Sequence, residues 1–153
     1  DMANRIYTGP QDLQPKTLTN RTCAAALLPG TWVSILIATV AQATAPTAVR
    51  LGLLGERDWF STGQLDANDP LKTAYASGDT AQVYLPRPGE TYMSAVAAAT
   101  YTNGQELTVS AAGRLAAAAS GNVVVAYYDG PNSVARSAGD LVDVVIANFY
   151  TKA

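Results

Sequence analysis

Turn-forming residues divide most of this chain into short segments, and they constrain the fold more than any other feature of the sequence. Several of the turn signals lie about ten residues apart. After Arg21 they are Pro29-Gly30, Pro46, Gly55, Gly63, Gly78-Asp79, Pro88-Gly89, Asn103-Gly104, Gly113, Gly121-Asn122, Asp129-Gly130-Pro131 and Gly139-Asp140.

The segments between these turns are short apolar or alternating runs, which favour strands. We expect strands at Trp32–Thr39, Ala48–Leu54, Thr80–Leu85, Tyr92–Ala98, Glu106–Val109, Val123–Tyr128 and Leu141–Asn148. Helix signals are scarce: Asp69-Pro70 could cap a short turn over Leu71–Ala76. The sequence therefore predicts a mostly β fold, a single small β-barrel or β-sandwich domain with at most one or two short helices.

The first part of the chain differs from the rest. Residues 1–22 are largely polar, carry Pro10 and Pro15, and show no amphipathic period. We interpret them as an extended N-terminal arm that precedes a β-rich domain at 23–153. Such an arm either frays or becomes ordered on a neighbouring subunit. Its candidate anchors are Ile6, Tyr7, Leu13 and Leu18.

One internal similarity links two distant segments. Ala76–Leu85 resembles Ser137–Ile146, because in both a small residue and Gly-Asp lead directly into an apolar strand. Glycine permits a positive φ at such a turn, and aspartate accepts hydrogen bonds from nearby backbone amides. Two explanations remain open: tight turns recur by chance in β proteins, or a strand-entry unit has been duplicated.

Composition excludes several classes of partner. Charged residues make up 14% of the chain, the net charge is −2, and the basic residues form no stripe that could neutralise phosphates. We therefore expect no nucleic-acid partner. The longest apolar stretch, Trp32–Ala43, is too short to span a bilayer, and we expect no membrane partner. The single cysteine, Cys23, allows no disulfide within the chain.

The residues available for chemistry argue against an enzyme. The chain has no histidine, which removes serine and cysteine catalysis through histidine and the usual zinc sites. The carboxylates around Asp66 and Asp69 do not follow a calcium-loop pattern, and phosphate-binding loops are absent. An enzyme that uses carboxylates alone would need a pair about 5–10 Å apart, and no clear pair is evident. We expect no catalytic residue, cofactor or metal.

Adjacent aromatic residues stand out in the segment after Gly55. Trp59 and Phe60 follow Arg57-Asp58 outside any strand pattern. Large aromatic rings dominate both cores and interfaces, so the pair either covers the core or binds a partner. Both interpretations stay open.

Four stretches, taken in order, resemble the head decoration proteins of tailed bacteriophages. They are Ala26–Val33 with its Leu-x-Pro-Gly pattern, Gly78–Glu90, Asn103–Val109 followed by Gly113-Arg114-Leu115, and Val124–Tyr127 leading to Gly139–Val144. The resemblance covers most of 26–148, and against it residues 55–75 look like a loop insertion. It implies a small β-rich domain, often trimeric, that sits where capsomers meet and has no catalytic residues.

The resulting expectation is a structural virion protein. It would bind the outer surface of the assembled capsid, after synthesis in the bacterial cytoplasm, and stabilise the shell at capsomer junctions. Its partners would be the major capsid protein and itself, as a homotrimer. The candidate partner-binding residues are Ile6, Tyr7, Leu13, Leu18, Trp59 and Phe60. The alternative is another β-structured virion or surface module, such as a fibre tip or a carbohydrate-binding domain, in which Trp59-Phe60 would form the sugar platform.

Overall fold

The computed structural model describes residues 5–46, 50–57 and 69–153, and within these ranges it is a β protein without an α-helix. The predicted fold class is confirmed. The strands are β1 (Tyr7–Gly9), β2 (Thr17–Cys23), β3 (Trp32–Ile35), β4 (Thr39–Gln42), β5 (Leu51–Leu54), β6 (Thr80–Tyr84), β7 (Thr91–Ala95), β8 (Ala99–Thr100), β9 (Glu106–Val109), β10 (Leu115–Ala117), β11 (Val123–Tyr128), β12 (Ala135–Arg136) and β13 (Leu141–Thr151), with a 3-10 turn η1 (Ala111–Gly113) between β9 and β10.

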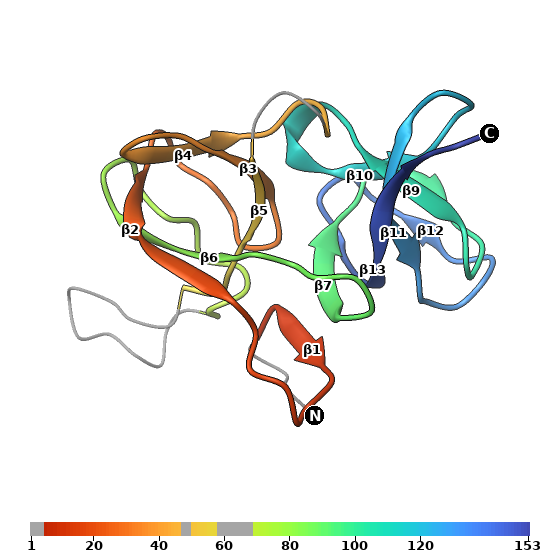
Figure 1. The fold of residues 1–153 in the computed structure, drawn as a ribbon, viewed down its shortest axis with the longest axis horizontal. Coiled ribbons are helices and arrows are strands. Elements are labelled where there is room, and N and C mark those ends of the chain that lie inside the picture. Colours follow the sequence, from red (N-terminus) through yellow and green to blue (C-terminus); the bar gives the residue numbers. More distant parts are fainter. Residues whose placement is uncertain (1–4, 47–49, 58–68) are drawn as a thin grey trace.

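The first half of the chain forms a closed barrel in the order β2-β4-β3-β5-β6, on the left of Figure 1. We call residues 16–85 unit 1. The strands β2 and β4 run parallel, and the other neighbours are antiparallel. Alternate residues along the strands point inward and fill the barrel, as a period of two requires. The buried set comprises Cys23, Leu27, Val33, Ile35, Val40, Leu54, Tyr75, Ala81 and Val83.

The second half, residues 90–151, forms the other lobe, and we call it unit 2. Its sheet has the order β1-β7-β13-β11-β9-β10. A parallel bridge from Val96, just after β7, to Leu115 in β10 brings the far strand back to β7, so this sheet also curls round on itself. A small two-stranded sheet of β8 and β12 lies beside it.

The two units share one topology. In chain order, β2, β3, β4, β5 and β6 correspond to β7, β9, β10, β11 and β13. In each unit the first strand pairs antiparallel with the last and makes parallel contact with the third. Four backbone hydrogen bonds of unit 1 also have an equivalent in unit 2. In each pair below, the first residue donates its N–H to the carbonyl oxygen of the second, and the unit 2 equivalent follows in parentheses: Gly30 to Leu54 (Gly104 to Tyr128), Leu54 to Thr31 (Tyr128 to Gln105), Ala43 to Trp32 (Ala118 to Glu106), and Leu85 to Lys16 (Ile146 to Glu90).

The two similar sequence segments occupy equivalent places in this scheme. Each forms a turn in which the backbone N–H of the first residue donates to the aspartate side chain, at 2.9 Å for Ala76 to Asp79 and 2.8 Å for Ser137 to Asp140. The intervening Gly78 and Gly139 have φ of 90° and 91°. Because the whole strand order is repeated around these turns, the structure favours duplication of a complete unit over chance recurrence of a turn.

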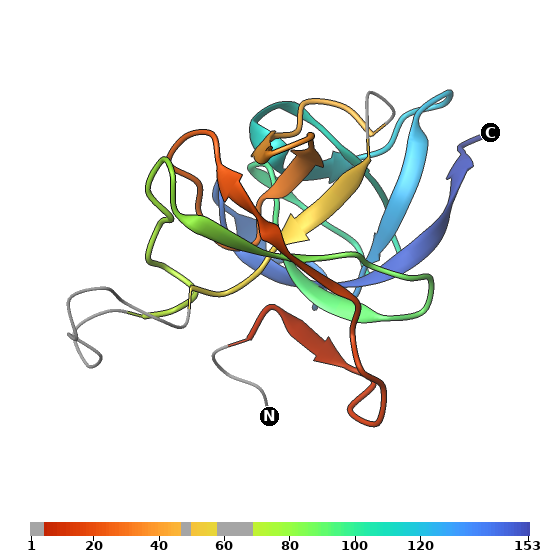
Figure 2. The same cartoon turned by 60° about the vertical axis from the view of Figure 1, so that its left-hand side comes forward.

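The structure of the N-terminal segment differs from the extended arm that the sequence predicts. Residues 5–22 do not form an arm separate from the domain, since β1 pairs with β7 and β2 is a strand of the unit 1 barrel. Figure 2 shows the segment running from β1 into β2 along the body of the protein. The prediction was wrong because the partners of these strands, β6 and β7, lie far away in the sequence, and nothing local indicates them.

Other predicted elements agree in part. The bounds of β9 and β11 are as predicted, whereas the predicted strand Trp32–Thr39 is divided into β3 and β4 by a tight turn at Leu36–Thr39. Asp69 caps a turn through a hydrogen bond from Leu71 N to Asp69 Oδ1 of 2.9 Å, and no helix follows. The β5–β6 connection, which contains the 55–75 segment, is longer than its counterpart between β11 and β13.

The two units are joined by a loop of unit 1 that packs on one end of unit 2. The loop before β3 brings Trp32 into a shared core, where its Nε1 donates to Ser94 Oγ at 2.9 Å. Ala95 N donates to Gly30 O at 2.9 Å. At Gly113, which has a φ of 65°, an added Cβ would lie 2.5 Å from Trp32 O, so glycine is required where the units meet. Among the residues that the structure describes, no helix is long and apolar enough to cross a membrane.

Candidate docking surface

The structure separates the four predicted partner-binding residues that it describes into three groups. Ile6 and Tyr7 are 0% and 1% exposed, so both serve the chain's own core and the prediction that they bind a partner is corrected. Leu18 is half-buried and packs on the unit 1 core. Leu13 is 49% exposed and stays available for contact. Trp59 and Phe60 lie outside the described residues.

A buried carboxylate explains why the N-terminal segment is held so firmly. Glu56 is 3% exposed and accepts hydrogen bonds from Ile6 N at 3.0 Å and from the Tyr84 hydroxyl at 3.0 Å. Arg5 lies 3.9 Å from the same carboxylate. Burial, reinforced by the charge of Glu56, raises the pKa of Tyr84 to about 12, so its hydroxyl stays protonated and donates. Glu56 thus ties the start of the chain to unit 1.

A second buried carboxylate occupies the junction between the units. Glu90 is 2% exposed and accepts hydrogen bonds from the Arg87 guanidinium at 2.7 Å and from the Tyr92 hydroxyl at 2.9 Å. Burial alone would raise the pKa of Glu90, but the hydrogen bonds from Arg87 and Tyr92 outweigh it and the pKa is lowered. Arg87 also donates to Gln14 O, which anchors the connection between β1 and β2.

These carboxylates have structural roles. Their oxygens are occupied by tyrosine, arginine and backbone donors that fix the chain path. Across residues 5–46, 50–57 and 69–153, no group of three or more histidine, cysteine, aspartate or glutamate side chains is placed to hold a metal ion.

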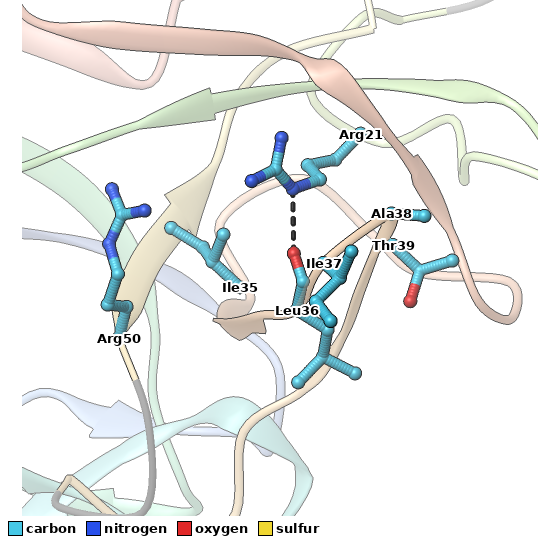
Figure 3. Close-up of a pocket in the computed structure, with 7 residues that line it drawn as sticks. All are labelled: Arg21, Ile35, Leu36, Ile37, Ala38, Thr39 and Arg50. Carbon is cyan, nitrogen blue, oxygen red and sulfur yellow. Dashed lines mark hydrogen bonds between the residues drawn. The ribbon is translucent and has the colours of Figure 1, made fainter.

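Among the residues that the structure describes, the most exposed large apolar side chain lies in the turn between β3 and β4. Ile37 is 95% exposed and Leu36 is 42% exposed. They border an open depression of about 640 Å³ that also includes Ile35, Arg21 and Arg50. Figure 3 shows Arg21 above the Leu36–Ile37 turn, and Arg50 on the far side of Ile35. Isoleucine at such exposure gains nothing for folding, which makes it a candidate contact point.

Hydrogen bonds to β2 hold this turn in place. Leu36 N donates to Thr39 O at 2.9 Å and closes the turn. Arg21 Nε donates to Leu36 O at 2.7 Å, the bond drawn in Figure 3, and Thr22 N donates to Ala38 O at 3.2 Å. The turn is therefore pre-organised, and a partner would not have to order it on binding. The sequence did not reveal it, because Leu36 and Ile37 continue an apolar run without glycine or proline.

A groove between the units is the second apolar feature. It has a volume of about 420 Å³ and lies between Leu28 and Leu71 of unit 1 and Met93 and Leu141 of unit 2. Lys72, Arg136 and Asp140 border it. Leu28 is 50% exposed at its edge.

Comparisons with known proteins give one result about the fold. No family model and no curated protein matches the sequence. Among solved structures, the chain is similar to "head fiber gp8.5 N base" of bacteriophage phi29, with a TM-score of 0.53 and 13% sequence identity. The match covers 92% of this chain and 100% of that one. The chain has the fold of a phage head fiber base. At this identity the likeness concerns the fold.

Proposed function

We propose that this chain is a structural protein of a tailed-phage virion that binds the outer surface of the assembled capsid and stabilises it at capsomer junctions. The observation that carries the proposal is the similarity of nearly the whole fold to a phage head fiber base. The sequence resemblance to head decoration proteins supports it independently. On this proposal the chain has no enzymatic activity, and its partner is the major capsid protein.

The physical properties of the chain suit this role. Its buried networks around Glu56 and Glu90 make a body that binds without rearrangement. A protein that binds the assembled shell and not its separated subunits stabilises the shell by mass action. Because many copies bind one shell, their modest individual binding energies sum to a large stabilisation of the shell.

The first experiment tests binding and stabilisation together. Heads that lack the chain would be purified from the phage that encodes it. They would then be mixed with the purified chain and sedimented. We expect the chain to sediment with expanded heads, and we expect the heads to resist heating and low salt better than untreated heads. A chain that stays in the supernatant at micromolar concentration, or that leaves head stability unchanged, would overturn the proposal.

Single substitutions test which residues contact the capsid. Because residues 5–23 belong to the folded body, deleting them would not isolate a binding arm. Leu13→Asp and Trp59→Ala are better probes, since Leu13 is exposed and Trp59 is a predicted anchor. We propose that each weakens head binding at least about tenfold. Phe149→Asp is the control, because Phe149 is 41% exposed and was not predicted to bind. Equal binding by all variants would contradict this assignment of residues.

A further inference from the structure

The contact between the two units joins two different surfaces. We call the first surface A, which in unit 1 is the loop Leu28–Trp32. The second is surface B, which in unit 2 consists of Ser94–Ala95, Ala112–Arg114 and Gly139–Leu141. Surface A of unit 1 packs on surface B of unit 2. Such a contact is heterologous, and it leaves one copy of each surface without its counterpart.

Both of the remaining surfaces are exposed. Surface A of unit 2 is Thr102–Glu106, the segment equivalent to Leu28–Trp32. The equivalence follows from the matching hydrogen bonds that Gly30 and Gly104 donate. Pro29 to Trp32 are buried in unit 1, whereas Asn103 and Gly104 are exposed.

Surface B shows the same contrast. Surface B of unit 1 corresponds to Arg21–Thr22, Ile37–Thr39 and Gly78–Thr80. Gly113 of unit 2 is buried, while the matching turn of unit 1 presents Ile37 at 95% exposure.

The two exposed surfaces have complementary chemistry. Surface B of unit 1 carries the apolar Ile37 and the cationic Arg21, and Leu36 and Arg50 lie beside them in the same depression. Beside surface A of unit 2 lie the exposed carboxylate of Asp129 and the apolar side chain of Val134, which is 39% exposed.

The loop that carries Asp129 and Val134 is joined to surface A by hydrogen bonds. Asn103 Nδ2 donates to Gly130 O at 2.9 Å, and Asn103 N donates to Asn132 Oδ1 at 2.6 Å. Surface A of unit 2 and its neighbouring loop are therefore acidic and apolar, which complements the basic and apolar surface B of unit 1.

We infer that a second copy of this chain covers the Leu36–Ile37 turn, with surface A of unit 2 from one copy seated on surface B of unit 1 from the next. The contact repeats between chains the arrangement that joins the two units within one chain. A repeated heterologous contact forms a ring when its rotation closes and a filament when it does not. The homotrimer expected from the sequence resemblance would be one such ring. This inference does not rest on capsid binding.

Sedimentation of the full chain tests the inference. We expect the wild-type chain to self-associate in a concentration-dependent way. Ile37→Asp and Val134→Arg should each weaken association at least about tenfold, because each places a charge in an apolar contact and the second faces two arginines. Both residues are exposed, so neither change disturbs the core. Phe149→Asp, which alters an exposed side chain that belongs to neither surface, should associate like the wild type.

Mixing the two variants distinguishes this contact from a symmetric one. The Ile37→Asp chain keeps surface A of unit 2, and the Val134→Arg chain keeps surface B of unit 1. A mixture should therefore form dimers and nothing larger. A symmetric contact through Ile37 would let the Val134→Arg chain associate by itself, and mixing would produce no new species; that result would overturn the inference. A wild-type chain that stays monomeric up to ~1 mM, or an Ile37→Asp chain that associates normally, would overturn it as well.

Discussion

Glu90 illustrates how single residues hold this protein together. Its carboxylate is almost fully buried, and it receives hydrogen bonds from the side chain of Arg87 and from Tyr92. Removing one partner of a buried, hydrogen-bonded charge pair costs more than the pair contributes, because the remaining charge keeps its desolvation penalty. Glu90 also accepts a hydrogen bond from Arg87 N, which shapes the turn that leads into β7.

We predict that Glu90→Gln lowers the free energy of unfolding at pH 7 by about 1–3 kcal/mol, since the new amide faces the Arg87 guanidinium. The folded-state pKa of Glu90 is lowered, so its contribution is present above the ordinary pKa of 4.5 and fades as the pH falls below it. Urea unfolding from pH 7 to pH 3 measures the difference between wild type and variant. A difference that grows toward low pH would contradict the assignment, and Asp12→Asn, at an exposed position, is the control.

At the scale of elements, the N-terminal strand β1 is part of the folded body. It adds to the edge of β7, where Met93 N donates to Ile6 O at 2.7 Å. The rings of Tyr7 and Tyr92 meet edge to face with centroids 5.2 Å apart. Covering an edge strand in this way also protects it from pairing with other chains.

Deleting residues 1–9 should therefore destabilise the fold by roughly 3–6 kcal/mol, the value for losing two large buried side chains. It also removes the N–H that Ile6 donates to Glu56. Thermal unfolding followed by circular dichroism measures the loss. An unchanged melting temperature would show that the segment is a separate arm after all.

How far the sequence predicts these elements depends on whether their signals are local. The bounds of β9 and β11 were predicted because turn residues bracket them, as Asn103-Gly104 does before β9. The β3–β4 turn was missed because Leu36 and Ile37 carry no turn signal. The strands β1 and β2 were missed because their partners are distant. The main candidate surface lies on that missed turn, so only the fold could reveal it.

At the scale of the whole molecule, two similar units behave as one body. A single apolar cluster joins Trp32 and Leu53 of unit 1, Ile6 of the N-terminal segment and many residues of unit 2. The similar Gly-Asp turns indicated part of this repeat in the sequence. The full correspondence was hidden because matching positions, such as Trp32 and Glu106, share no chemistry.

We predict that the two units unfold in one cooperative transition because they share this core. In a Trp59→Phe background, Trp32 is the single tryptophan and reports on the junction between the units. Its fluorescence and the far-ultraviolet circular dichroism should change at the same denaturant concentration. Two separated transitions would show that each unit is stable alone.

On the proposed function, this chain occupies the outside of a phage head. A reconstruction by electron cryomicroscopy of expanded heads, imaged with and without the added chain, tests it most directly. We predict additional two-lobed density on the outer surface at the junctions between capsomers. Density inside the shell, or no additional density at a saturating concentration of the chain, would contradict the claim.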